Sequence, residues 1–210
     1  QSAGKSSFAL QCLAAAQRAG GTSVLIETEQ ALETERASTF GCALEDVVLI
    51  QPDHIEGVLE AIESVMKRAR RKPLLVVWDS VAATPTKREI DEGLTGSVAI
   101  GERARVLSAG CRLLTGMAAE RSASLLLVNQ VRDAIGVMYG DKWTTPGGHA
   151  VKFAASIRLQ LFSGKTVKDG ADHIAKAVTF SAVKNRFAPP YRKAKVRLNF
   201  ATGWDDAWST

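Results

Sequence analysis

Short apolar runs alternate with longer amphipathic segments along most of the chain, and this alternation predicts strands that alternate with helices. The apolar runs are rich in Val, Leu and Ile and predict strands at residues 22–29, 46–52, 73–80 and 124–130. Apolar residues at helical spacing predict helices at residues 6–19, 30–41, 55–72 and 101–120. The order of these elements favours an α/β fold with a mostly parallel twisted sheet flanked by helices.

The pattern changes in the last third of the chain. Residues 152–162, 175–183 and 193–200 alternate apolar and polar side chains, which predicts half-exposed strands that form an antiparallel edge. No linker, repeat or low-complexity segment interrupts the sequence. We therefore expect a single domain over residues 1–210.

Composition narrows the class of protein only a little. With 46% hydrophobic and 23% charged residues, the 210-residue chain can bury one sizeable core. Its apolar runs are too short to cross a membrane, and Cys12, Cys42 and Cys111 lack paired spacing, so we expect a cytoplasmic protein without a membrane partner. The net charge of +5 permits a polyanionic partner but does not require one. The histidines are too scattered to predict a structural metal site.

The first residues, QSAGKSS, match the second half of the phosphate-binding loop G-x-x-x-x-G-K-[ST]. The first glycine of that pattern would lie two residues before Gln1, so we expect the chain to begin within the motif. Backbone N–H groups and the positive end of the following helix bind phosphate oxygens in such loops. The alternative is a chance Gly-Lys-Ser before a helix. The residues predicted to bind the nucleotide here are Ser2, Ala3, Gly4, Lys5, Ser6 and Ser7.

Polar side chains close three of the predicted apolar strands. Glu27 and Glu29 end the first strand, Asp79 ends the third, and Gln130 ends the fourth. Ligands of open α/β sheets bind at the carboxyl ends of the strands, which favours a site at this edge. An aspartate after such a strand is typical of a Mg²⁺ ligand in nucleotide-binding proteins. For Asp79 alone, a role in a turn or a helix cap is an equally good interpretation.

These residues, in this order, resemble the RecA family of ATP-dependent recombinases over essentially the whole chain. The resemblance rests on SAGKSS, LIETEQALE, VVWDSVAA, the stretch from VNQVRDAIG to FAASIRL, and VKNRFAPP. It implies a RecA-like P-loop ATPase core, with its N-terminal part cut within the phosphate loop. Trp78 departs from the family pattern and indicates a diverged member, of bacterial or phage origin.

The resemblance also implies catalytic roles, with ATP as the nucleotide and Mg²⁺ as its metal ion. Ser6 and Asp79 would be the metal ligands, and Lys5 would contact the outer phosphates. Glu29 matches the carboxylate that activates the attacking water, and Glu27 would support it. Another expected role falls to Gln130, which matches the amide linking the γ-phosphate to the second DNA-binding loop.

The adenine side departs from the family, which often stacks a tyrosine on the base. Arg36 occupies the corresponding position, and a guanidinium plane can also stack on a π-face. Glu33 holds the acidic position that contacts adenine in the family. The alternative is that both are solvent-facing helix residues.

Two DNA-binding loops are implied by the resemblance, at about residues 92–100 and 131–148. Arginines beside glycine-rich backbone contact phosphates and orient nucleic acid without reading its sequence. Apolar residues in such loops can wedge between bases, and an aromatic ring can stack on them. Ordinary packing is the alternative for Ile100, Ile135 and Trp143. Ala134 departs from the basic residue of many relatives. The DNA-contacting candidates are Ile100, Arg103, Arg105, Arg112, Arg132, Ile135, Trp143, Gly147 and Gly148.

A basic segment, AVKNRFAPPYRKAKVR, follows near the C-terminus. As a bare cluster it could be a solvated hairpin. In the family, however, the cations that match Lys184 and Arg186 reach the ATP of the neighbouring subunit, as arginine-finger equivalents do. Phe153 matches an aromatic residue of the same interface, although a core role is a serious competitor.

The sequence therefore predicts a DNA-dependent ATPase that forms filaments on single-stranded DNA and catalyses homologous pairing and strand exchange with double-stranded DNA. Such a protein would act in DNA recombination and repair. One alternative is another RecA-fold motor, such as a hexameric helicase or a RadA-type branch-migration ATPase, which would lack this glycine-rich second loop. A second is a non-catalytic mediator, against which the retention of Lys5, Glu29, Asp79, Lys184 and Arg186 argues.

Overall fold

The structure is a computed structural model that describes residues 3–29, 34–70, 72–93, 101–133, 143–145 and 148–205. The chain forms two compact units. The parallel unit comprises Leu13–Leu32 and Glu45–Ala154. The antiparallel unit comprises Gln1–Cys12, Glu33–Leu44 and Ala155–Thr210. Helix α1 (Lys5–Arg18) contributes to both, and the 3₁₀ turn η1 (Leu44–Asp46) contains the boundary between Leu44 and Glu45.

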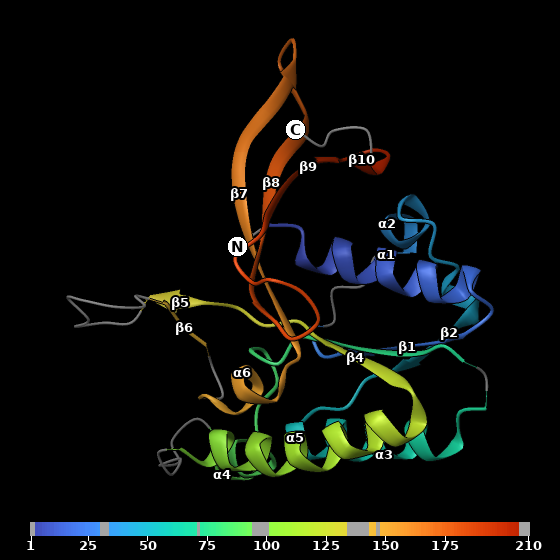
Figure 1. The fold of residues 1–210 in the computed structure, drawn as a ribbon, viewed down its shortest axis with the longest axis vertical. Coiled ribbons are helices and arrows are strands. Elements are labelled where there is room, and N and C mark those ends of the chain that lie inside the picture. Colours follow the sequence, from blue (N-terminus) through green and yellow to red (C-terminus); the bar gives the residue numbers. More distant parts are fainter. Residues whose placement is uncertain are drawn as a thin grey trace. The chain divides into compact units, whose positions relative to one another are not determined.

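The parallel unit is built on a four-stranded sheet in the order β2-β1-β3-β4 (Figure 1). Its strands are β1 (Thr22–Glu27), β2 (Val47–Ile50), β3 (Leu74–Asp79) and β4 (Ala123–Leu127). All three neighbouring pairs are parallel, as the alternation of strands and helices predicts. The two central strands, β1 and β3, are continuous apolar segments whose side chains are mostly buried, whereas Val48 and Leu49 of the edge strand β2 are exposed.

Helices α3 (Ile55–Arg68) and α5 (Glu102–Arg121) connect these strands, as expected from the sequence. Two shorter helices, α4 (Lys87–Glu92) and α6 (Ala150–Ala154), complete the unit with the strand pair β5 (Arg132–Asp133) and β6 (Trp143–Thr144). The buried face of α3 repeats at helical spacing and packs against β1 and β3. This core includes Val24, Ile26, Ile55, Val58, Ile62, Met66, Val76, Trp78 and Leu107.

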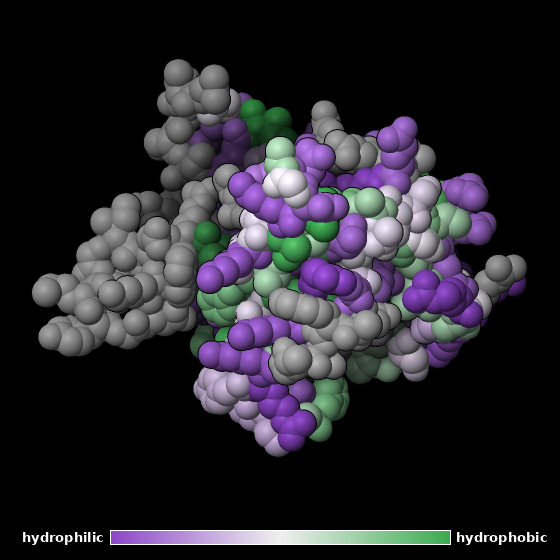
Figure 2. Space-filling model, turned by 90° about the horizontal axis from the view of Figure 1, so that it is seen from above, coloured by the Kyte–Doolittle hydropathy of each residue, from purple (hydrophilic) through white to green (hydrophobic). Residues whose placement is uncertain are grey.

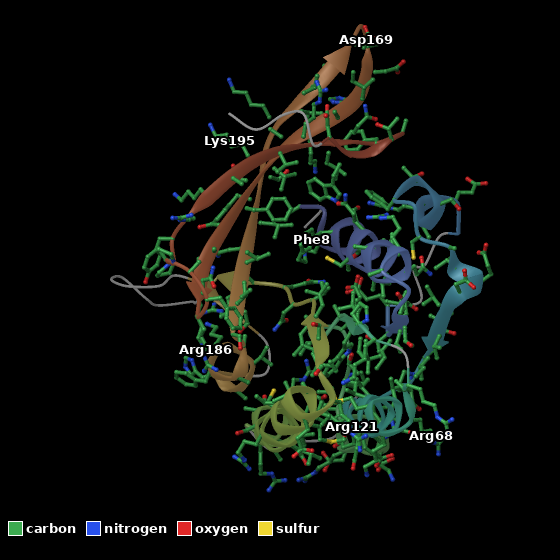
Figure 3. All side chains as sticks on the ribbon, turned by 45° about the vertical axis from the view of Figure 1, so that its right-hand side comes forward. Phe8, Arg68, Arg121, Asp169, Arg186 and Lys195 are labelled. Atoms are coloured by element: carbon green, nitrogen blue, oxygen red, sulfur yellow. The ribbon has the colours of Figure 1, made fainter. Side chains whose placement is uncertain are left out.

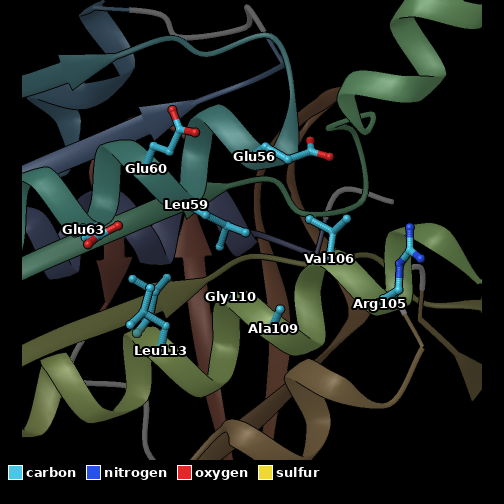
Figure 4. Close-up of a pocket in the computed structure, with 10 residues that line it drawn as sticks. Glu56, Leu59, Glu60, Glu63, Arg105, Val106, Ala109, Gly110 and Leu113 are labelled. Carbon is cyan, nitrogen blue, oxygen red and sulfur yellow. The ribbon is translucent and has the colours of Figure 1, made fainter.

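Close contact between α3 and α5 depends on Gly110. A Cβ atom at this position would lie 2.5 Å from both terminal methyl groups of Leu59, so a larger side chain would require Leu59 to move. Figure 4 shows Leu59 pointing from α3 towards α5, with Leu113 on the facing side. The resulting shallow groove has an apolar floor and carries Glu56, Glu60 and Glu63 along α3.

The antiparallel unit is built on a second four-stranded sheet, in the order β10-β9-β8-β7. Its strands are β7 (Ile157–Asp169), β8 (Asp172–Asn185), β9 (Lys193–Asn199) and β10 (Gly203–Asp205). Phe180 contacts the rings of Phe8 and Trp204, with centroid distances of 5.3 and 5.2 Å, so the first turns of α1 pack on one face of this sheet. Helix α2 (Thr34–Thr39) belongs to the same unit. On the surface shown in Figure 2, hydrophilic residues lie between apolar ones.

One predicted strand begins later than expected. The alternating pattern places residues 152–162 in a strand, but α6 contains Lys152 and Phe153, and β7 begins only at Ile157. The Phe153 N–H donates to the carbonyl of His149, which closes a helical turn. A short alternating run also satisfies helical spacing over one turn, so the pattern alone does not distinguish the two.

We expect Gly21→Ala to destabilise the parallel unit strongly. A Cβ atom at residue 21 would lie 2.1 Å from the carbonyl oxygen of Pro73, the same oxygen that accepts the Thr22 N–H at 2.8 Å and joins β1 to β3. Because the clash involves backbone, the free energy of unfolding should fall by about 3 kcal/mol. Urea denaturation followed by circular dichroism measures the change.

Gly116→Ala is the matched control. Gly116 lies within α5, and no atom lies within 4 Å of the position of its Cβ. Helix propensity predicts a gain of about 0.5–1 kcal/mol for this variant. Equal stabilities of the two variants would contradict the close approach of Gly21 to Pro73.

Candidate functional site

The carboxyl edge of the parallel sheet gathers the acidic residues predicted from the sequence. Glu27 and Asp79 are register partners in the β1–β3 pair, so residues far apart in sequence lie side by side. The Thr28 N–H continues the ladder by donating to the Asp79 carbonyl at 2.9 Å. Glu29 lies two residues after the end of β1, and Ser80 directly follows the end of β3.

The Glu29 carboxylate is held by two donors from other segments. The Ser80 hydroxyl donates to its Oε1 at 2.5 Å, and the Gln130 amide reaches the same atom at a long 3.4 Å. Glu27 is buried and serves a different purpose. Its Oε1 accepts the Glu29 N–H at 3.0 Å, and its Oε2 accepts the Gln51 amide at 3.2 Å. Glu27 therefore fixes the backbone from which Glu29 projects.

A network of hydroxyl groups beneath this edge was not predicted from the sequence. The Thr84 hydroxyl donates to the Ser80 carbonyl at 2.8 Å and lies 2.9 Å from the Thr28 hydroxyl. It also accepts the indole N–H of Trp78 at 3.1 Å. Trp78 is almost fully buried, so this hydroxyl satisfies a donor that has no access to water. The Ser80 N–H donates to Thr28 Oγ1 at 3.1 Å, and the Asp79–Ser80 peptide bond is cis.

The described part of the phosphate loop lies in the antiparallel unit, at the N-terminus of α1. Gly4 has a φ of 82°, and a Cβ there would lie 3.0 Å from Leu198 and Trp204. Lys5 is the first residue of α1, Ser6 is exposed, and the buried Ser7 hydroxyl accepts the Arg36 guanidinium at 3.2 Å. Arg36 thus anchors α2 to the start of α1 while its side chain stays largely exposed. Ser2 and Glu33 lie outside the described residues.

A cationic cluster lies where β7 and β8 pair in the same unit. Arg158 and Lys184 are register partners, and Arg186 follows at the end of β8, where Figure 3 labels it among nitrogen-tipped side chains. Partial desolvation, together with the charges of Arg186 and Arg158, lowers the pKa of Lys184. Like charges held this close favour the binding of an anion, which would relieve their repulsion.

The predicted DNA-contacting arginines have different surroundings in the structure. Arg103 is half-buried and forms an ion pair with Glu89 at 2.9 Å, which ties α5 to the capping box of α4. Burial alone would raise the pKa of Glu89, but the Arg103 guanidinium and the Thr86 N–H hold it below its ordinary value. Arg105 and Arg112 are exposed on α5, although Arg105 lies 3.5 Å from Glu102 and Arg112 contacts Ser108.

Gly148 has a left-handed backbone conformation, and its DNA-contacting role stays a prediction. Its φ is 70°, and a Cβ would lie 3.0 Å from that of Ala104 on α5. Phe153 is 72% exposed, which argues against the core alternative, and its ring lies 5.8 Å from that of His149. Ile100, Ile135 and Gly147 lie outside the described residues. Only the backbone of Arg132 and Trp143 is described, in the β5–β6 pair.

The parallel unit therefore brings together Glu27, Glu29, Asp79 and Gln130, whereas the cations expected at the nucleotide lie in the antiparallel unit. Across the described ranges, no group of three or more His, Cys, Asp or Glu side chains is arranged to hold a metal ion. None of the helices in the described part of the chain is long and apolar enough to cross a membrane.

Comparisons with known proteins identify the family and the fold of the chain. The sequence matches the RecA N-terminal domain family over residues 1–205. It is 40% identical to Protein RecA of Thermus thermophilus over 206 residues, 98% of this chain and 60% of the relative. Protein RecA of Gloeobacter violaceus is 37% identical over 203 residues, 97% of this chain and 54% of the relative. The crystal structure of the RadB recombinase has a TM-score of 0.67 at 22% identity, over 97% of this chain and 86% of that one.

The helix-flanked parallel sheet, together with the antiparallel sheet, defines a RecA-like α/β fold. The sequence matches make the assignment narrower: the chain belongs to the RecA family. It spans about 60% of the length of the Thermus relative.

We expect Thr84→Val to weaken the fold even though the two side chains have nearly the same shape. The substitution leaves the buried Trp78 N–H without its acceptor, which should cost about 1–3 kcal/mol of the free energy of unfolding. Thr84→Ser keeps the hydroxyl and is the control, with a smaller loss expected. Urea denaturation measures both, and a Val variant as stable as the Ser variant would show that the hydrogen bond is unimportant.

Proposed function

We propose that this chain is the ATPase and DNA-binding core of a recombinase, which forms filaments on single-stranded DNA and exchanges strands with a homologous duplex. Membership of the RecA family gives the general class. The observation that carries the specific proposal is the Glu29 carboxylate, held at the carboxyl edge by Ser80 and Gln130.

Glu29 is positioned to act as the general base. A water that attacks the γ-phosphorus must lose a proton, and the carboxylate accepts it as the new P–O bond forms. The bond to the β–γ bridging oxygen breaks, and ADP and phosphate are the products. The Ser80 hydroxyl restricts the rotamers of Glu29, and Glu27 fixes its backbone, so the base needs little reorganisation.

The residues present also fit the nucleotide and its metal ion. Gly4, Lys5 and Ser6 supply the backbone donors, the cation and the hydroxyl that a triphosphate requires at a helix N-terminus. Magnesium prefers oxygen ligands and retains several waters. The Ser6 hydroxyl in the antiparallel unit and the Asp79 carboxylate in the parallel unit are each a ligand of this kind. When bound, Mg²⁺ neutralises charge on the phosphate oxygens. Arg36 and Glu33 would contact the adenine.

The cluster of Lys184 and Arg186 suits the anionic triphosphate of a neighbouring subunit. The positive charges of Lys184 and its neighbours Arg186 and Arg158 repel one another, and a bound anion would relieve this repulsion. Cations supplied by a second subunit would also stabilise the negative charge of the transition state. Phe153, exposed on α6, would join the same interface. ATP bound between subunits would thereby favour the filament and the DNA-contacting state of the loops.

Arg103 is half-buried and pairs with Glu89, whereas Arg105 and Arg112 are exposed on α5 and would make the main phosphate contacts of this helix. Gly148 would allow the second loop to approach the DNA backbone closely. These contacts are independent of base sequence, as a search for homology requires.

We expect Glu29→Gln to lower the rate of DNA-dependent ATP hydrolysis by about 10²- to 10⁴-fold, because the amide cannot accept the proton. Nucleotide and single-stranded DNA should still bind. Phosphate release by the purified protein, with and without single-stranded DNA, measures the rate.

Glu60→Gln is the matched control, since Glu60 is exposed on α3 and the charge change is the same. This variant should hydrolyse ATP at the unmodified rate. Full activity of the Glu29 variant would remove the base assignment. Absence of DNA-stimulated hydrolysis in the unmodified protein would reject the proposed function itself.

A further inference from the structure

The first turn of α5 carries a carboxylate beside an arginine that the proposed function assigns to DNA. Glu102 begins α5, and Arg105 follows one turn later on the same helix. The Arg105 Nη2 atom lies 3.5 Å from Glu102 Oε1, although the Arg105 side chain is 78% exposed. Figure 4 shows Arg105 extending from the start of α5. An anion of the protein therefore already lies beside the guanidinium that a DNA phosphate would approach.

Glu102 also contacts a second arginine. The Arg88 Nη1 atom, on α4, lies 3.5 Å from Glu102 Oε2, and the Arg88 Nε atom pairs with Glu92. Only 10% of the Glu102 side chain is exposed, whereas nearly half of the Arg88 side chain is exposed. The Glu102 carboxylate therefore lies between two guanidinium groups, one on each helix, and most of its surface is shielded from water.

Complementing the helix dipole is the simpler role for an acidic residue in a first turn. The Oε2 atom of Glu102 does not match that role, because it is buried and accepts no hydrogen bond from the described residues, the backbone N–H groups of α5 included. Its contacts with Arg88 and Arg105 are both longer than an ordinary hydrogen bond. Such ion pairs are weak, so a closer anion can displace the carboxylate from Arg105.

We propose that Glu102 is a positioning residue that restrains DNA binding by Arg105. The inference rests on the proposed function, because it requires that Arg105 contact a DNA phosphate. In the DNA-free protein the carboxylate neutralises part of the guanidinium charge and holds it against the first turn of α5. When a phosphate takes its place, the carboxylate keeps its contact with Arg88, so its charge is not left unpaired in a shielded position.

The restraint applies to one end of the arginine row on α5. Arg112 lies about two turns beyond Arg105 on the same side of the helix. It is exposed, and within the described part of the chain it contacts the Ser108 hydroxyl at 3.3 Å instead of a carboxylate. A phosphate that binds Arg112 therefore displaces a neutral group, whereas a phosphate that binds Arg105 displaces an anion. The two arginines differ in affinity although both are exposed.

The test compares Glu102→Gln with Glu120→Gln, which removes the same charge from an exposed position near the other end of α5. Fluorescence anisotropy of labelled oligothymidine gives the affinity over a range of salt concentrations, with a non-hydrolysable ATP analogue present throughout. The Glu102 variant should bind about two- to fivefold more tightly at low salt, the range expected for a weak exposed ion pair. Its slope of log K against log salt should steepen by about 0.7, because an unpaired Arg105 neutralises one further phosphate of the strand.

A double variant shows whether Glu102 acts through Arg105. Arg105→Gln should weaken binding, and the addition of Glu102→Gln to it should restore nothing, since no cation remains to be released. A purely structural role of Glu102 would change affinity equally with and without Arg105 and would leave the salt slope unaltered. Circular dichroism during thermal unfolding checks that each variant is folded.

The outcomes separate this inference from the proposed function. Equal affinities of the Glu102 and Glu120 variants, or a gain that persists in the Arg105→Gln background, would overturn the restraint while the unmodified protein still binds single-stranded DNA. An unmodified protein that does not bind single-stranded DNA would reject both the restraint and the proposed function.

Discussion

Parallel pairing of β1 with β3 is the constraint on which the rest of the site depends. The register that opposes Glu27 to Asp79 also places Ser80 within hydrogen-bonding distance of both Thr28 and Glu29. Side chains alternate along a strand, so a shift of one residue would turn the aspartate to the other face of the sheet. The apolar contacts of Val24, Ile26, Val76 and Trp78 specify this register, and the buried core therefore aligns the acidic edge.

Trp78 shows how a departure from the family pattern is accommodated. A large ring fills the core beneath the carboxyl edge, and its N–H finds an acceptor in Thr84. The same hydroxyl contacts Thr28 and Ser80, so the packing of the core and the orientation of Glu29 share one polar atom. The Thr84 hydroxyl therefore couples the packing of Trp78 in the core to the hydrogen bonds that orient Glu29.

The periodicity of the sequence was sufficient for the parallel strands and for α3 and α5, because long apolar runs and helical stripes leave few alternatives. It was insufficient at Phe153, where a short alternating run formed a helical turn. The partners of Ser80 and Thr84 were also beyond sequence reasoning, since small hydroxyl residues are compatible with almost any environment. Arg103 was expected to face DNA, yet its pairing with Glu89 depends on how α4 meets α5, which no local pattern encodes.

Gly148 has a wider consequence. It abuts Ala104 in the first turn of α5, just after Gly101, so the segments that lead into α5 and α6 meet at one tightly packed seat. A bulkier residue at either position would displace both helix starts together. The starts of α5 and α6 are therefore coupled through one contact, although residues 104 and 148 are far apart in the sequence.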